Sequence, residues 1–203
     1  ASPPYNLIQK WECILHSEKY INIMLVFLEF LDDDQFLVGS NKSKKVRLMK
    51  VDDASVVRSF EVGSRVYSIS TMDSSSFVTG HEDWSIKLWK LNSKKCLHTF
   101  KGHQKFVSSI AKVDDSCFIS GSWDRTAKLW DIRSGNCLQT FSGHVGNVNA
   151  VVYMPTEKKL LTASDDSTIK IWSLDKFGSD VGEDAARNNE NAGEANTNKD
   201  VEL

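Results

Sequence analysis

The stretch that decides the fold runs from residue 102 to residue 131 and reads GHQKFVSSIAKVDDSCFISGSWDRTAKLWD. A second version of it, GHVGNVNAVVYMPTEKKLLTASDDSTIKIWS, occupies residues 143–173. His103 and His144 are 41 residues apart, and Trp130 and Trp172 are 42 apart. A unit repeated at this period indicates a repeat protein in which each copy folds as one piece of supersecondary structure.

The Gly-His pair, the Ser-Gly-Ser-Trp-Asp segment and the Lys-Leu-Trp-Asp segment, at these spacings, resemble the WD40 family. The resemblance extends over roughly residues 18–174 and implies an all-β protein, a β-propeller of four recognisable blades. The four units span roughly residues 18–60, 61–101, 102–142 and 143–174.

The two earlier units keep the period while the motif decays. In the second unit Trp89 matches Trp130, but Val62, Gly63 and Ser64 replace the expected Gly-His. In the first unit Met49 stands where the later units have tryptophan, 40 residues before Trp89. We therefore expect the first blade to have lost its polar core.

Both ends of the chain differ from the repeats. Residues 1–17 form a lead-in that contains an orphan outer strand at 11–16, while the acidic, Asn-rich residues 175–203 have too few apolar side chains to build a core and are expected to be disordered. Because the fourth unit then lacks an outer strand, we expect residues 11–16 to pair beside the strand that ends at Trp172. Such a closure would remove an open sheet edge.

The way the ring closes is left open by the sequence. Propellers have four to eight blades, and the WD40 family mostly uses seven or eight. A fragment or shortened relative of a larger propeller is favoured by the missing initial methionine and the degenerate first unit. A closed four-bladed ring and self-association into a dimer are the alternatives.

An apolar run at residues 21–31 has two interpretations. It is too short to span a bilayer, which needs about 20 residues. A signal peptide is one interpretation, but Asp32, Asp33 and Asp34 follow where a cleavage site with small residues belongs. A buried inner strand is the interpretation that we adopt.

One polar constellation recurs with the repeat. The resemblance implies a structural tetrad in which the aspartate accepts a hydrogen bond from the histidine, the histidine meets a hydroxyl, and the hydroxyl meets the indole N–H. The tetrads comprise His103, Ser120, Asp124 and Trp130 in unit three and His144, Thr162, Asp166 and Trp172 in unit four, with a partial tetrad of Thr79, Asp83 and Trp89, without histidine, in unit two.

A catalytic Ser-His-Asp triad is the competing interpretation of unit three. The same constellation recurs in unit four with threonine, and no Gly-x-Ser-x-Gly elbow is present. A catalytic site has no reason to recur in each blade, whereas a network that locks each blade does. We therefore expect no catalytic residues.

Candidate binding residues lie next to the motifs. In similar propellers the residues that flank the first-strand valine, and the residue before the turn aspartate, point to the top face. In this sequence they are Arg65, Tyr67, Glu82, Phe106, Ser108, Trp123, Asn147, Asn149 and Asp165. Phe106 and Trp123 are the expected anchors, because aromatic side chains dominate binding hot spots; the alternative is that Trp123 merely covers the neighbouring blade.

The cysteines bear on cofactors and compartment. Cys13, Cys96 and Cys137 occupy equivalent settings in their units, too far apart for a disulfide, which needs Cα atoms within about 7 Å. We expect buried free thiols and an intracellular protein, cytoplasmic or nuclear. No Cys-x-x-Cys or His-x-x-x-His spacing suggests a metal, and no cofactor is expected.

The sequence thus predicts a non-enzymatic scaffold or adaptor that binds a protein or peptide on the propeller top face, and no membrane partner. The segment at residues 121–130 is similar to that of ubiquitin-pathway adaptors, so a substrate-recognition adaptor is a narrower alternative. A propeller-form enzyme and a nucleic-acid binder are the other classes. The net charge is −2, with −5 in residues 178–203 and +3 elsewhere. A nucleic-acid binder would carry a strongly basic surface, which this charge does not indicate. The C-terminal Val-Glu-Leu is a candidate strand ligand for another protein.

Overall fold

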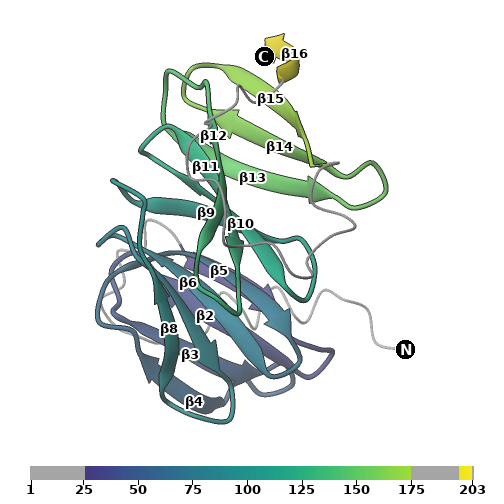
Figure 1. Ribbon diagram of the computed structural model, residues 1–203. Coiled ribbons are helices and arrows are strands. Elements are labelled where there is room, and N and C mark those ends of the chain that lie inside the picture. Colours follow the sequence, from purple (N-terminus) through teal and green to yellow (C-terminus); the bar gives the residue numbers. More distant parts are fainter. Residues whose placement is uncertain (1–25, 175–196, 203) are drawn as a thin grey trace.

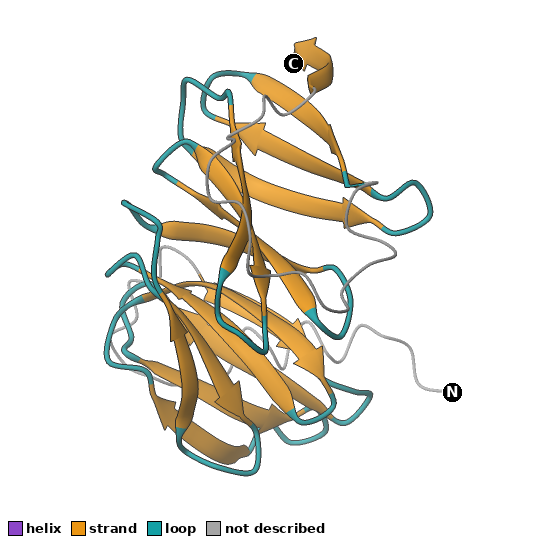
Figure 2. Ribbon diagram, in the orientation of Figure 1, coloured by secondary structure: helices purple, strands orange, loops and turns teal. Residues whose placement is uncertain are grey.

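The computed structural model describes residues 26–174 and 197–202, and every regular element within these ranges is a β-strand (Figure 2). The strands form four antiparallel sheets of four strands each, and neighbours in each sheet follow one another in the chain. This confirms the all-β class and the four blades. In the same ranges no helix is long and apolar enough to cross a bilayer.

The strands of blades one and two are β1 (Val26–Phe30), β2 (Gln35–Ser40), β3 (Lys45–Lys50), β4 (Val56–Glu61), β5 (Val66–Asp73), β6 (Ser76–His81), β7 (Ile86–Lys90) and β8 (Cys96–Phe100). Those of blades three and four are β9 (Val107–Lys112), β10 (Cys117–Ser122), β11 (Thr126–Asp131), β12 (Cys137–Ser142), β13 (Val148–Met154), β14 (Lys159–Ser164), β15 (Thr168–Ser173) and β16 (Thr197–Glu202).

The blades follow one another in chain order, with β4 near one end of the array and β16 at the other (Figure 1). Strands β1 and β2 pack against β5, strands β5 and β6 against β9, and strands β9, β10 and β11 against β13. The first strand of each blade is therefore the one that meets the neighbouring blade. This arrangement is that of the inner strands of a propeller.

Aromatic rings fill the interfaces between blades. Phe60 of blade one meets Phe77 and Trp89 of blade two, with ring centroids 4.9 and 6.3 Å apart. Phe100 of blade two meets Phe118 and Trp130 of blade three in the same way, at 5.0 and 5.8 Å. Edge-to-face contacts of this kind add about 0.5–1.5 kcal/mol beyond the area that they bury.

Blade four repeats the arrangement, with Phe141 of blade three 5.5 Å from Trp172. Both indoles in the last two blades are almost fully buried. In every interface the tryptophan thus enters the core shared with the preceding blade. Its ring joins two blades.

Blade one forms without a tryptophan. Met49 pairs with Phe36 across β2 and β3, as Trp89 pairs with Phe77 in blade two, and both Met49 and Phe36 are buried. The expected strand in the apolar run 21–31 is present as β1, and residues 21–25 lie outside the described residues.

The expected buried strand is buried on one face only in β1. Phe27 packs against the core shared with blade two, whereas Leu28 and Phe30 are 48% and 60% exposed. Successive side chains of a strand point to opposite faces. Only one face of β1 therefore lies against blade two.

The outer strand of blade four corrects two expectations. Residues 197–202 form β16, which pairs antiparallel with β15 from Thr168 to Trp172. The tail is therefore ordered at that point, and β16 occupies the place expected for residues 11–16, which lie outside the described residues. The backbone groups along the edge of β15 need partners whatever the composition of the partner segment, so a polar segment with little apolar content can still supply a strand.

The thiols also differ from expectation. Cys96 and Cys137 begin the outer strands β8 and β12 at equivalent places, as expected, but both are exposed and not buried. Each thiol lies against the backbone carbonyl two residues further on, in His98 and Gln139. Outer strands have only one neighbouring strand, which leaves their first residues open to solvent.

A small residue on the second strand of a blade contacts the first strand of the next blade. Gly121 in β10 faces Val148 and Val151 of β13, and a Cβ atom built on it would lie 2.8–2.9 Å from their methyl groups. The equivalent residue of blade four is Ala163, which is only half-buried. Glycine at residue 121 therefore allows β13 to approach.

We predict that Gly121→Ala lowers the free energy of unfolding by about 1–3 kcal/mol, because the new methyl group overpacks the interface between blades three and four. Urea unfolding monitored by tryptophan fluorescence measures the change. Ala163→Ser, which adds one atom at the equivalent position of blade four, should change stability by less than about 0.5 kcal/mol. Equal effects of the two substitutions would contradict the packing argument.

Candidate functional site

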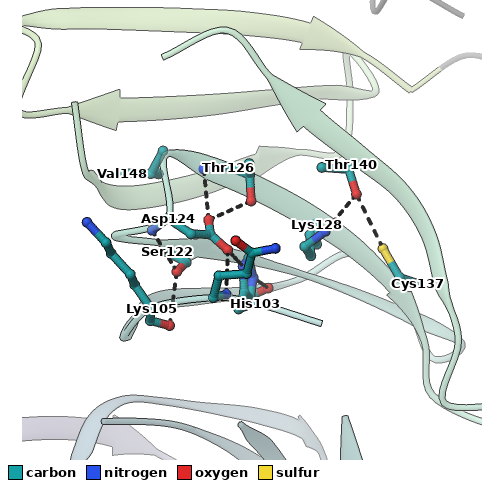
Figure 3. A network of polar contacts seen from close by, with 12 residues as sticks. His103, Lys105, Ser122, Asp124, Thr126, Lys128, Cys137, Thr140 and Val148 are labelled. Atoms are coloured by element: carbon teal, nitrogen blue, oxygen red, sulfur yellow. Dashed lines mark hydrogen bonds and ion pairs between the residues drawn. The ribbon is translucent and has the colours of Figure 1, made fainter. Parts of the chain in front are cut away.

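The tetrad of unit three forms one continuous chain of hydrogen bonds, and Figure 3 shows the surroundings of its His103 and Asp124. His103 Nδ1 lies 2.7 Å from Asp124 Oδ2, and His103 Nε2 lies 2.7 Å from Ser120 Oγ. The indole Nε1 of Trp130 donates to the same Ser120 oxygen at 2.8 Å. The loop before β9, the middle of β10, the β10–β11 turn and the end of β11 are thereby joined.

The order of donors in this chain follows from its two ends. Trp130 can only donate and the Asp124 carboxylate can only accept. Ser120 therefore accepts from the indole and donates its own proton to His103 Nε2, and the proton of a neutral His103 lies on Nδ1, facing Asp124. Every polar group in the chain has its partner, as buried groups require.

Unit four repeats this geometry with threonine. His144 lies 2.8 Å from Asp166 and 2.7 Å from the hydroxyl of Thr162, to which Trp172 donates at 2.9 Å. The backbone N–H of Val145 also donates to Asp166. The four tetrad residues of the two units thus make the same contacts.

The unit-three residues do not form an accessible catalytic site. Ser120 has no exposed surface and His103 is buried. The Ser120 hydroxyl accepts from Trp130 and donates its proton to His103. A substrate cannot reach this oxygen without unfolding the blade.

Electrostatics within the tetrad favour a neutral imidazole. Burial lowers the pKa of His103, although the hydrogen bond and charge of Asp124 oppose the shift. Burial of Asp124 acts to raise its pKa, but hydrogen bonds from His103, Thr126 and Gln104 outweigh burial and hold the pKa below its ordinary range. The pair therefore consists of a neutral histidine and a carboxylate at neutral pH.

The expected partial tetrad of unit two is wrong in one member. His81, two residues after Thr79, supplies the imidazole: its Nε2 lies 2.7 Å from Thr79 Oγ1, to which Trp89 donates at 2.9 Å. Asp83 stays outside the chain; its carboxylate accepts from Ser85 and lies 3.8 Å from Lys87 Nζ. His81 enters the blade from β6 and not from the preceding loop, so its Nδ1 cannot meet the turn carboxylate.

Blade two carries its histidine at a different position from blade three. Val62 stands at the place of His103, and His81 stands at the place of Ser122. In blade three the hydroxyl of Ser122 accepts from the backbone N–H of Asp124. In blade two, where histidine stands in place of this serine, Ser64 Oγ accepts from the backbone N–H of Asp83 instead. The signal in the sequence was the histidine after Thr-Gly where the other units have serine.

The position of His81 leaves one of its ring nitrogens without a hydrogen-bond partner. His81 is fully buried, and its Nδ1 has no hydrogen-bond partner of ordinary geometry. Burial lowers the pKa of His81 to about 4, helped by the charge of Lys87. Blade two therefore contains a neutral histidine with one unpaired nitrogen.

The candidate binding residues lie at one end of the blades and are positioned by the same backbone contact in each. The residue before the first strand offers its carbonyl to the N–H of the residue before the turn aspartate, at 2.9–3.0 Å. The pairs are Arg65 with Glu82, Phe106 with Trp123, and Asn147 with Asp165. Blades two, three and four thus each present two adjacent side chains at this end, which we call the top surface.

Three aromatic residues meet on the top surface. Tyr67 stacks on Phe106 with centroids 5.1 Å apart, and Trp123 lies 5.1 Å from Phe106 and 6.4 Å from Tyr67. All three are half-buried. Burial raises the pKa of Tyr67, and the nearby Glu82 adds to the shift. Trp123 therefore does pack onto its neighbour blade, through Tyr67, and at the same time contributes to a shared aromatic cluster.

Polar pairs lie on both sides of the aromatic cluster. In blade two Arg65 forms an ion pair with Glu82 at 3.0 Å. In blade four Asn147 and Asn149 both donate to the carboxylate of Asp165. Ser108 lies between the cluster and blade four, because its hydroxyl donates to the carbonyl of Val148. All nine predicted residues thus belong to one row across three blades.

A separate hollow of about 470 Å³ lies beside the β6–β7 turn. Its lining includes Trp84, Lys87, Thr99 and Lys101. Trp84 is 50% exposed and has a left-handed backbone with φ 69°, as do Arg125 and Ser167 at the same place in the next two turns. The turn geometry is therefore a property of the repeat and not of Trp84. Within the described residues no cluster of three potential metal ligands occurs.

We predict that Asp124→Ala lowers the free energy of unfolding by about 1–3 kcal/mol more than Asp83→Ala, because only Asp124 holds an imidazole. Both carboxylates accept from the backbone and hydroxyl two residues later, so the difference reports mainly the contacts that only Asp124 makes, with the His103 imidazole and with the backbone N–H of Gln104. Chemical denaturation of both variants measures it. Equal losses would show that the tetrad does not couple His103 to the turn.

We predict a loss of stability in mild acid that depends on His81. Its pKa is about 4 in the folded chain and about 6.5 in an unfolded one, so only the unfolded state binds the proton in between. The contribution of His81 to the free energy of unfolding should therefore fall by about 3 kcal/mol as the pH drops from 6.5 to 4, and remain constant above that range. Denaturation curves of the protein and of His81→Gln test this, and parallel pH profiles would exclude it.

Comparison with known proteins gives the family. A model of the WD domain, G-beta repeat, matches residues 55–90, 94–131 and 135–173. Each match begins with the outer strand of one blade and ends with the third strand of the next, which ties neighbouring blades together. No curated protein matches the chain significantly. Since the three matched segments cover more than half of the sequence, the chain belongs to the WD40 repeat family.

Proposed function

We propose that this chain is a non-enzymatic scaffold or adaptor that binds a peptide segment of a partner protein on its top surface. WD40 repeats generally mediate interactions between proteins. The observation that carries the proposal is the cluster of Tyr67, Phe106 and Trp123, which come from two blades and keep part of their surface open to solvent.

The buried network supports the division between core and surface. The tetrad side chains of blades three and four are hydrogen-bonded to one another in the core, while the top-surface residues take no part in these networks. Phe106 and Trp123 are instead held by a backbone bond between their own residues, at 3.0 Å. Rigid aromatic side chains of this kind bury a large area on binding at a small cost in side-chain entropy.

Narrower assignments rest on fewer observations. The segment at residues 121–130 supports a substrate-recognition adaptor of the ubiquitin pathway as a special case. The free thiols of Cys96 and Cys137, exposed to solvent, support an intracellular place of action, in the cytoplasm or nucleus. Self-association that completes a ring is an additional proposal, tested by the molar mass in solution.

We predict that Phe106→Ala combined with Trp123→Ala abolishes partner binding while the fold is retained. Hot-spot aromatic residues contribute about 2 kcal/mol each or more, so the affinity for a partner captured from cell extract should fall at least 100-fold. Binding titrations measure the loss, and circular dichroism reports on the fold.

Trp84→Ala is the matched control, because it removes an exposed tryptophan that lies outside the aromatic cluster. It should leave the affinity unchanged within about twofold. Unchanged binding by the double variant would refute the proposed surface. Loss of binding in Trp84→Ala alone would move the site to the hollow beside the β6–β7 turn.

A further inference from the structure

Blades two and four place different charges at the same pair of positions. In blade two the position before the first strand holds Arg65, which neutralises the carboxylate of Glu82 at 3.0 Å. In blade four the equivalent residue is Asn147, and the carboxylate is that of Asp165. Blade two thus shows that an arginine before the first strand can pair with a carboxylate in the turn. In blade four this arginine is absent.

Two amides hold the Asp165 carboxylate in place without neutralising it. Asn147 Nδ2 donates to Oδ2 at 2.8 Å, and Asn149 Nδ2 donates to Oδ1. A carboxylate has about four lone-pair sites, so both oxygens retain capacity for a donor from solvent. Asp165 is exposed, and no ion pair to it occurs among the described residues.

Neither the cation on the top surface nor two cations close in sequence to Phe106 and Trp123 pair with Asp165. Arg65 is engaged by Glu82. Lys105 and Arg125, which are close in sequence to Phe106 and Trp123, form no ion pair with Asp165. No cation among the described residues therefore neutralises this carboxylate.

The aromatic cluster and this carboxylate lie on neighbouring blades. Ser108, two residues after Phe106, donates to the carbonyl of Val148, which stands between Asn147 and Asn149. The strand that follows Phe106 therefore contacts the strand whose asparagines hold Asp165, which places the apolar surface and the oriented negative charge on the same end of two adjoining blades. A ligand that spans them needs an apolar group and a cation a short distance apart.

We propose that the top surface recognises a peptide segment in which an arginine lies beside an apolar side chain. This inference rests on the proposed function and adds the chemistry of the partner. The apolar side chain packs on Phe106 and Trp123, and the guanidinium donates to Asp165, as Arg65 does to Glu82 in blade two. Arginine fits better than lysine because its planar fork matches a carboxylate held in one orientation.

Selection from a random display library of 12-residue peptides tests the chemistry directly. The folded chain is the bait, and the Phe106→Ala, Trp123→Ala double variant removes peptides that bind elsewhere. Enriched peptides should contain arginine within one or two residues of an aromatic or aliphatic residue. Peptides dominated by acidic residues would overturn the inference.

Matched variants then isolate the charge. Asp165→Asn keeps the size of the side chain, and it should weaken a selected peptide about fivefold and reduce the dependence of its affinity on salt, as expected for an exposed ion pair. The same peptide with citrulline in place of arginine should bind the unaltered protein about as weakly as the arginine peptide binds Asp165→Asn.

Asp115→Asn is the control, because it removes an exposed carboxylate at the other end of β10 from Trp123. It should leave peptide affinity unchanged. If Asp165→Asn binds like the unaltered protein, or if selected peptides lack a basic residue, the arginine inference fails while the top surface remains the binding site. If no peptide depends on Phe106 and Trp123, both the inference and the proposed function fail.

Discussion

The hydrogen bond from the tryptophan indole to a buried hydroxyl is the contact on which the rest of the structure depends. Ser120 and Thr162 each accept it at 2.8–2.9 Å, and the hydroxyl is itself fixed by histidine. This bond satisfies the only polar atom of a large ring, and the ring is then free to lie in the core shared with the preceding blade, where Phe100 or Phe141 meets it. Order within a blade and packing between blades are therefore set by one side chain.

Blade two shows which parts of this arrangement are essential. The indole, the hydroxyl and an imidazole are all kept, although the imidazole comes from His81 on β6 and the carboxylate link is absent. The essential requirement is a donor or acceptor for the hydroxyl in a dry interior, because an unpaired hydroxyl there costs about as much as a lost hydrogen bond. In blade two the group left without a partner is one nitrogen of the buried His81 imidazole. Because the pKa of this imidazole is lowered to about 4, we expect blade two to be the blade most sensitive to acid.

The sequence predicted the parts of the molecule that repeat. The blade class, the two complete tetrads and the row of top-surface residues follow from spacings of 41 and 42 residues, since equivalent positions in a repeat occupy equivalent places. His81 was missed because the motif places the histidine before the first strand of the blade. In blade two the histidine lies on the second strand instead, at a position close to the usual one in space but not in sequence, so the spacing of the repeat does not reveal it. The strand at residues 197–202 was missed because composition describes the average of a segment, whereas pairing depends on the edge offered to it.

The same repeat explains why binding residues can vary without loss of the fold. Val66, Val107 and Val148 are identical and have no exposed surface, whereas the residues before them are arginine, phenylalanine and asparagine. Alternation along a strand sends the valine into the core and both of its neighbours toward the other face. A substitution at a neighbour therefore changes the charge or apolar area of the top surface while the tetrad beneath it is unaffected. A blade of this kind separates the residues that determine stability from those that determine which partner is bound.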